Sequence, residues 1–200
     1  MMMISAGGMM DKKDFIICCD MDDTIEHLVA AWISWLNAKH NLDVKYDDIK
    51  DWNISLFYPT LTQSQVFEPL NQDDFWKTVQ PMPDAIIYIK KLIDEGFSFY
   101  ICTASHYNAL KTKMEEVLFK YFPYLNWKNV IVTQNKQLIK CDVLVDDGAH
   151  NILGDYIGLL KDAPYNKEFD EHAHLSVMRV HDWEEIYNLI HQIYNLARVR

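Results

Sequence analysis

The chain is predicted to be an α/β protein with a Rossmann-like parallel sheet as its core and a small helical cap inserted after the first strand. Two observations predict this class. Apolar strand patterns alternate with helical patterns along most of the 200 residues, and one irregular stretch with scattered aromatic side chains interrupts that alternation. Half of the residues are hydrophobic, which is sufficient for the packed core of one domain.

The early part of the chain supplies one strand, one helix and the interruption. Residues 15–19 are apolar and have charged residues on both sides, as expected for a buried parallel strand. Residues 25–40 carry apolar side chains at helical spacing, whereas residues 41–81 are polar and irregular, with no convincing long strand. The predicted division of the chain is a mobile tail at 1–12, a core at 13–25 and 82–200, and a helical cap at 26–81.

Regular alternation resumes at Pro83. Asp84 is a suitable helix N-cap, and Gly96 suits the position just after the end of that helix. The later elements are predicted to be strands at 97–102, 130–132, 143–145 and 177–180, and helices at 106–122 and 183–196. A polar loop at 161–174 is expected between the last two strands. Strands separated by helices indicate a parallel sheet with helices on both faces.

Composition and charge exclude several classes of protein. The net charge is −10 without a long basic block, so we expect no nucleic-acid polymer as partner. No apolar run reaches the ~18 residues that a membrane span needs, and the start lacks the pattern of a signal peptide. The four cysteines show no zinc-type spacing, and we interpret them as reduced core residues of a cytoplasmic protein. The oligomeric state stays open, with a homodimer as one alternative.

An acidic run directly follows the first strand. Asp20, Asp22 and Asp23 stand close together at the carboxyl end of a parallel strand, where open α/β sheets bind ligands. Such a cluster is costly to desolvate unless a cation neutralises it, and carboxylate oxygens suit Mg²⁺. The alternative is a solvated acidic turn that binds nothing.

Polar side chains also follow three later strands. They are Thr103 and Ser105, then Lys136, then the pair Asp146 and Asp147. Because the carboxyl ends of parallel strands meet at one edge of a sheet, we expect these groups to converge with the acidic run. Hydroxyl and ammonium donors suit the oxygens of a phosphoryl group, although Thr103 and Ser105 are also suitable caps for the next helix.

Together these residues suit phosphoryl transfer. Asp20 can act as a nucleophile and can bind Mg²⁺ together with Asp147. Asp22, two residues further on, can give a proton to the leaving alcohol and later take one from water. Thr103 and Lys136 can hold the phosphate oxygens.

The four groups stand in the same order as the four motifs of the haloacid dehalogenase (HAD) superfamily, which the chain resembles. The resemblance implies that Asp20 is the nucleophile, that Asp22 is the general acid/base with its main-chain carbonyl on the metal, and that the insertion is a C1 cap. An aspartate at position 22 resembles the phosphatases of this superfamily rather than its dehalogenases or transport ATPases. Residues 145–151 resemble a Gly-Asp-Gly-x-x-Asp form, which favours Asp147 as the direct metal ligand and gives Asp146 a supporting role.

A closer resemblance, over residues 13–155, is to the 5′(3′)-deoxyribonucleotidase family. It rests on residues 74–85 at the end of the cap and on residues 119–147, which include the lysine and the acidic pair. The resemblance implies a Mg²⁺-dependent phosphatase of deoxyribonucleoside monophosphates, in which aromatic side chains of the cap stack on the base. The candidates for stacking are Phe57, Phe75 and Trp76, although the adjacent pair also suits the interior of a small cap.

The departures from that family concern the substrate. Gln134 and Asn135 precede the lysine, and Gly148 follows the acidic pair, at positions where the family often has charged residues. These differences leave the preference for base and sugar open. The alternatives are a phosphatase of another small ester, such as a sugar phosphate or a phosphorylated cofactor, and a non-catalytic protein that binds a phosphorylated ligand. The second is disfavoured because no motif carboxylate is missing.

Overall fold

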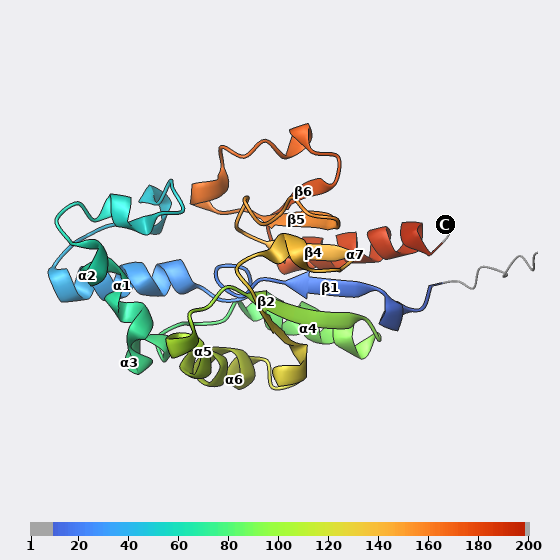
Figure 1. The fold of residues 1–200 in the computed structure, drawn as a ribbon, viewed down its shortest axis with the longest axis horizontal. Helices are drawn as coiled ribbons and strands as arrows, with labels where there is room; N and C mark the ends of the chain where they lie inside the picture. The colour runs from blue at the N-terminus through green and yellow to red at the C-terminus, as the bar shows by residue number, and fades with distance from the viewer. Residues whose placement is uncertain (1–9, 199–200) are drawn as a thin grey trace, which may run out of the picture.

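The core of the protein is a sheet of six strands that all run parallel, in the order β3-β2-β1-β4-β5-β6 (Figure 1). The computed structural model describes residues 10–198. The strands are β1 (Ile16–Cys19), β2 (Ser98–Thr103), β3 (Val130–Val132), β4 (Val143–Asp146), β5 (Ile157–Lys161) and β6 (Val177–Val180). This architecture confirms the predicted α/β class with a Rossmann-like parallel sheet.

The predicted tail at 1–12 lies largely outside the described residues. At its end, the carbonyl of Met10 accepts a hydrogen bond from the Tyr194 hydroxyl at 2.8 Å. Lys12 begins the 3₁₀ turn η1 (Lys12–Asp14) and forms an ion pair with Glu95 at 2.7 Å. The last residues of the predicted tail therefore contact the core.

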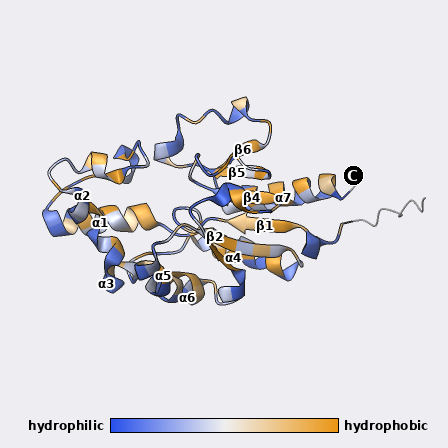
Figure 2. Ribbon diagram, viewed as in Figure 1, coloured by the Kyte–Doolittle hydropathy of each residue, from blue (hydrophilic) through white to orange (hydrophobic). Residues whose placement is uncertain are grey.

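β1 lies in the middle of the sheet, between β2 and β4, and Figure 2 shows the hydrophobic character of these strands. Cys18 and Cys19 point to opposite faces, because Cys19 packs in the main core while Cys18 packs in a smaller cluster with Cys102 and Cys141. All four cysteines are buried and free, as the sequence predicts.

The helices of the core pack against one face of the sheet. The main hydrophobic core takes its helical residues from α4 (Pro83–Asp94), α5 (Tyr107–Lys113), the π turn η5 (Met114–Leu118), α6 (Phe119–Tyr121) and α7 (Trp183–Ala197). Within the described residues, the clusters on the other face contain no α-helical side chain. The prediction of helices on both faces is therefore wrong, because loops and short 3₁₀ turns cross that face.

The sequence pattern does not predict β5. Its segment is short and contains Gly158, a residue that weakens a strand on propensity alone. The fold supplies the reason for this glycine. A Cβ atom at position 158 would lie 2.5 Å from the side chain of Ile152 and 2.7 Å from its carbonyl oxygen, so Ile152 packs directly on the β5 backbone.

The ends of α4 differ in how well the sequence predicts them. Gly96 has a φ of 97°, as expected for the residue that follows a helix. Asp84, however, lies inside α4, whose N-cap is Met82. Its carboxylate accepts the main-chain N–H of Trp183 at 3.2 Å, so Asp84 joins α4 to α7 instead of capping its own helix.

The insertion forms a cap of short helices at the carboxyl end of the sheet, on the left of Figure 1. Its helices are α1 (Leu28–His40), η2 (Tyr46–Asp48), η3 (Ile54–Phe57), α2 (Gln63–Phe67), η4 (Glu68–Asn71) and α3 (Asp73–Trp76). Its two connections to the core run side by side, since the N–H of His27 donates to Gln80 and the N–H of Met82 donates to Ile25, both at 2.9 Å. In residues 10–198 we find no helix with the length and apolar character needed to cross a membrane.

Candidate active site

Three carboxylates meet where β1 and β4 end. The main-chain N–H of Asp20 donates to the carbonyl of Val145 at 2.8 Å, which continues the pairing of β1 with β4 beyond the last strand residue. Asp20, Asp146 and Asp147 each offer one oxygen, and these oxygens lie within 4.8 Å of one another. All three residues are buried. The acidic run is therefore not a solvated turn.

Lys136 joins two of these carboxylates. Its ammonium nitrogen lies 2.6 Å from Oδ1 of Asp20 and 2.7 Å from Oδ2 of Asp146, and the side chain is almost fully buried. Burial favours the neutral amine, but the two carboxylates outweigh it and raise the pKa of Lys136. Burial also raises the pKa of Asp20 to about 7, against the opposing effect of Lys136.

A second buried lysine, Lys113, forms an ion pair with Asp22, the other proposed catalytic aspartate. Its ammonium nitrogen lies 2.6 Å from Oδ1 of Asp22, 2.6 Å from the Ser105 hydroxyl and 3.0 Å from the Thr103 hydroxyl. Burial alone would raise the pKa of Asp22, but the positive charge of Lys113 opposes burial, and the pKa lies below its ordinary value. The structure thus brings Thr103 and Ser105 to Asp22.

Sequence reasoning misses Lys113. The signal is its spacing from Ala109, because residues four apart on α5 share one face and both are buried. The π turn η5 begins directly after Lys113, and such turns are frequent at functional sites. The N-cap of α5 is His106, which leaves the hydroxyls of Thr103 and Ser105 free for Lys113.

The two neighbours Asp146 and Asp147 have different surroundings. Asp146 is fully engaged by the protein: Oδ2 contacts Lys136, and Oδ1 accepts from the N–H of Gly148 at 2.8 Å and from the Asn151 amide at 3.2 Å. One oxygen of Asp147 accepts the Tyr165 hydroxyl, and the other has only a long contact of 3.4 Å from Thr24. Asp147 therefore has the freer oxygen.

These residues fit a divalent cation. Asp20, Asp146 and Asp147 carry three negative charges when ionised, and Lys136 supplies one positive charge among them. Burial, together with Asp146 and Asp20, raises the pKa of Asp147 well above its ordinary value, so the cluster lacks positive charge. A hard cation with oxygen ligands, such as Mg²⁺, would supply it.

Two cavities adjoin this group. A cavity of about 300 Å³ is lined by Asp20, Lys136 and Gln134 among others, and a cavity of about 370 Å³ extends from Asp22 and Asp147 into the cap. The second is largely apolar. Trp52 of the cap lines both, and its ring centroid lies 5.0 Å from that of His150 and 5.4 Å from that of Tyr165 in the core. Sequence reasoning does not select Trp52.

The aromatic residues expected to stack on a base lie elsewhere in the cap. Phe75 is fully buried against Trp35 and Trp76, and Trp76 donates its indole N–H to the carbonyl of Leu70 at 3.0 Å. Neither these two nor Phe57 lines the cavity beside Asp22. Trp76 does reach the edge of the site, because its ring centroid lies 5.5 Å from the ammonium nitrogen of Lys113.

Comparisons with known proteins identify the family. The family model of the 5′ nucleotidase, deoxy (Pyrimidine), cytosolic type C protein matches residues 14–197. The chain is 31% identical to the 5′(3′)-deoxyribonucleotidase of Bacillus subtilis over 173 residues, which are 86% of this chain and 95% of that protein. It is 28% identical to the protein of the same name from Clostridium acetobutylicum over 168 residues, 83% of this chain and 89% of that one.

Solved structures agree on the fold. One is a HAD family hydrolase from Deinococcus radiodurans, solved with phosphate and sodium, which superposes on this chain with a TM-score of 0.61 at 13% identity. The match covers 92% of this chain and 97% of the hydrolase chain. A HAD hydrolase from Bacillus subtilis, solved with magnesium, has a TM-score of 0.54 at 14% identity. That match covers 88% of this chain and 98% of the hydrolase chain. The chain therefore belongs to the family of cytosolic type C 5′ nucleotidases, deoxy (pyrimidine), and is a HAD-fold phosphoric monoester hydrolase.

Proposed function

We propose that the protein is a Mg²⁺-dependent phosphatase that hydrolyses deoxyribonucleoside monophosphates through an aspartyl-phosphate on Asp20. The observation that carries the proposal is the pairing of two buried lysines with the two motif aspartates. Lys136 lies 2.6 Å from Asp20 and Lys113 lies 2.6 Å from Asp22. Two cations at the edge of an acidic site suit a dianionic phosphate, because each can bind its oxygens once the substrate enters.

The metal would be held by Asp20, Asp147 and the main-chain carbonyl of Asp22. The freer oxygen of Asp147 supports its role as direct ligand, and the full engagement of Asp146 supports a role in orienting Lys136. Bound Mg²⁺ would offset the repulsion between the carboxylates and the phosphate. Thr103 and Ser105 lie beside Lys113, where their hydroxyls are available to phosphate oxygens.

The proposed reaction has two steps. An oxygen of Asp20 attacks the phosphorus, the bond between phosphorus and the ester oxygen breaks, and protonated Asp22 gives its proton to the leaving alkoxide. Water then attacks the phosphorus of the aspartyl-phosphate while Asp22 takes one of its protons. Inorganic phosphate leaves, and Asp20 is restored as a carboxylate.

A nucleotide is the proposed substrate for two reasons. The relatives are named 5′(3′)-deoxyribonucleotidase, and an apolar cavity of about 370 Å³ continues from the catalytic aspartates into the cap. Trp52 stands where the two cavities meet, and base stacking on an aromatic ring contributes ~1–3 kcal/mol. Stacking by Phe57, Phe75 or Trp76 stays a prediction that would require the cap to rearrange. The four free cysteines support a reducing compartment such as the cytoplasm.

The proposal is tested by release of inorganic phosphate from dUMP and dTMP with Mg²⁺, with sugar phosphates in the same panel. Asp20→Asn should abolish phosphate release in a protein that still unfolds cooperatively, with a lower melting temperature because Lys136 loses one carboxylate partner. Asp155→Asn changes an exposed carboxylate and should leave phosphate release unchanged. A fully active Asp20→Asn variant would refute the mechanism. If only sugar phosphates were hydrolysed, a nucleotide as substrate would be refuted, whereas the proposed phosphatase mechanism would stand.

A further inference from the structure

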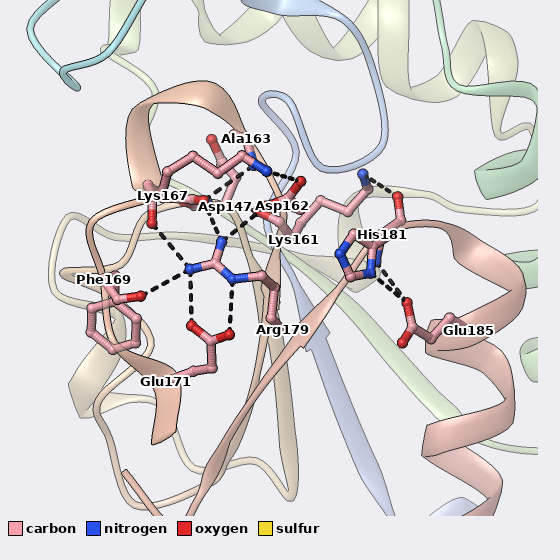
Figure 3. A network of polar contacts seen from close by, with 11 residues as sticks. Asp147, Lys161, Asp162, Ala163, Lys167, Phe169, Glu171, Arg179, His181 and Glu185 are labelled. Atoms are coloured by element: carbon pink, nitrogen blue, oxygen red, sulfur yellow. Dashed lines mark hydrogen bonds and ion pairs between the residues drawn. The ribbon is translucent and has the colours of Figure 1, made fainter. Parts of the chain in front are cut away.

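Arg179 on β6 is the centre of a polar network that organises the loop between β5 and β6 (Figure 3). Its guanidinium binds both oxygens of Glu171, at 3.0 and 3.1 Å, and Oδ1 of Asp162 at 3.0 Å. It also donates to the carbonyl of Phe169 at 3.0 Å and to Oδ1 of Asn166 at 2.8 Å. The loop therefore wraps around one largely buried cation, and the reaction described above does not use it.

Asn166 connects this network to the acidic site. Its Oδ1 accepts from Arg179 and from the N–H of Ala163 at 3.1 Å. Its amide nitrogen donates to the carbonyl of Lys161 at 2.8 Å and to the carbonyl of Asp147 at 2.9 Å. The side chain is buried and uses all four of its hydrogen-bonding positions, so its orientation is fixed.

The preceding residue holds the Asp147 side chain. The hydroxyl of Tyr165 donates to Oδ2 of Asp147, and the Tyr165 ring also touches Trp52 of the cap. The loop therefore contacts Asp147 at two points. Asn166 donates to its main-chain carbonyl, and Tyr165 donates to its carboxylate.

We propose that the loop at 162–171 is a strap that positions Asp147 for metal binding, with Asn166 and Tyr165 as positioning residues and Arg179 as the anchor that holds them. The inference rests on the proposed role of Asp147 as a metal ligand. Asp20 and Asp146 repel Asp147 in the metal-free protein, so a carboxylate with only its own strand to support it would turn away. The strap keeps Asp147 in the cluster before the cation arrives, and loss of such support typically costs 10–100-fold in metal affinity.

The test compares Asn166→Asp with a matched control in the full-length protein. Asn166→Asp keeps the oxygen that faces Arg179 but loses the donor that holds the carbonyl of Asp147. Asn129→Asp is the control, because Asn129 likewise donates to a strand carbonyl, that of Phe99 at 3.2 Å, and accepts from Asn126 at 3.2 Å. The primary readout is the dissociation constant of Mn²⁺, measured directly from the free Mn²⁺ signal by electron paramagnetic resonance.

We expect Asn166→Asp to weaken Mn²⁺ binding at least tenfold, and Asn129→Asp to leave it unchanged. Phosphate release by Asn166→Asp should recover at high Mg²⁺, which a merely structural defect would not allow. An unchanged Mn²⁺ affinity in folded Asn166→Asp, equal weakening in the control, or no Mn²⁺ binding by the wild type would each overturn the inference. A wild type that binds Mn²⁺ but hydrolyses no nucleotide would refute the proposed function alone.

A second pair of variants covers the case in which Asn166→Asp does not fold. Tyr165→Phe removes one hydroxyl from Asp147 and should also weaken Mn²⁺ binding about tenfold. Tyr187→Phe removes the same group from Glu95, at the other end of the core, and should leave Mn²⁺ binding unchanged. Equal Mn²⁺ affinities for these two variants would overturn the inference.

Discussion

The ammonium nitrogen of Lys113 lies 2.6 Å from Oδ1 of Asp22, and only 1% of the lysine side chain is exposed. The pair holds the pKa of Asp22 low, against the effect of burial, so the carboxyl is ionised before a substrate binds. A proton donor to the leaving group must be protonated. We infer that a phosphate which takes over the hydrogen bonds of Lys113 releases Asp22 from this partner and raises its pKa toward the value that acid catalysis needs.

The first prediction concerns Lys113→Met. Methionine fills similar space but can neither bind phosphate oxygens nor pair with Asp22. We expect kcat/KM for deoxyribonucleoside monophosphates to fall by about 10²–10³, the usual cost of one lost hydrogen-bond donor to the reacting group. The measurement is steady-state phosphate release with saturating Mg²⁺.

The control for Lys113→Met is Lys120→Met. Lys120 follows on the same helical segment and is half exposed, with a 3.8 Å ion pair to Glu116 and a contact of its ammonium nitrogen with the Tyr121 ring at 5.1 Å. It should keep wild-type kcat/KM, because exposed pairs of this kind contribute little. Equal loss of activity in the two variants would show that any lysine change on this segment is harmful and would remove the special role of Lys113.

The contrast between Lys113 and Lys136 shows what sequence can predict of this site. Lys136 is identified because it stands in a short segment between two predicted strands, ten residues before the acidic pair, and because the motifs follow in the expected order. Lys113 lies on an amphipathic helix among several other lysines. Its spacing from Ala109 places the two residues on one helix face, but that pattern does not say that a lysine there is buried. The burial follows from the packing of α5 against α3 and η4 of the cap.

Some strands of the fold can likewise be predicted from the sequence, and others cannot. β1, β2 and β4 are predicted because buried central strands are continuous apolar runs. β5 is not, because Gly158 is required by the approach of Ile152, a contact that exists only in the folded chain. In the cap, tertiary packing decides which aromatic rings are interior and which face the cavity, so Phe75 and Trp52 cannot be told apart by sequence alone.

The second prediction separates these two aromatic residues. Trp52 is 53% exposed and lines both cavities, so Trp52→Ala should raise KM for dTMP about tenfold through lost stacking and leave the melting temperature nearly unchanged. Phe75 is fully buried, so Phe75→Ala should lower the free energy of unfolding by ~3–5 kcal/mol.

Kinetics on dTMP and thermal denaturation of both variants make the comparison. Folded Phe75→Ala protein should retain the wild-type KM. A raised KM for Phe75→Ala together with an unchanged KM for Trp52→Ala would assign the stacking role to Phe75 and contradict the prediction.

The third prediction concerns Asp23, which is buried with a φ of 49°. Burial raises its pKa to about 8, because the single hydrogen bond from the N–H of Val29 does not compensate. Between the ordinary pKa of 3.8 and about 8, the folded protein holds a proton that the unfolded chain has lost. The free energy of unfolding should therefore fall as pH rises across this window.

Asp23→Asn removes this titration and keeps an oxygen for Val29, and asparagine tolerates a positive φ. In metal-free buffer, Asp23→Asn should melt at a higher temperature than the wild type at pH 8, and the two melting temperatures should converge near pH 4. Thermal denaturation at several pH values measures the difference. A gain that does not depend on pH would mean that backbone preference, not charge, sets the stability at this position.

The last prediction concerns metal-free stability and compares Asp147→Asn with Asp146→Asn. Asp147 is buried beside Asp20 and Asp146 and forms no ion pair within residues 10–198, so Asp147→Asn relieves repulsion while its amide oxygen still accepts the Tyr165 hydroxyl. We expect it to melt several degrees higher than the wild type in EDTA at pH 7.5. Asp146→Asn should melt lower, because Lys136 loses one of its two buried carboxylate partners.

Adding Mg²⁺ should reverse the order of wild type and Asp147→Asn. A ligand that binds only the folded state stabilises it by RT ln(1 + [L]/Kd), so the wild type should rise in melting temperature with Mg²⁺ while Asp147→Asn barely responds. The variant should also lose phosphate release, which makes Asp147 a residue that costs stability in exchange for function. Equal Mg²⁺ responses in the two proteins would show that Asp147 is not the ligand and would transfer that role to Asp146.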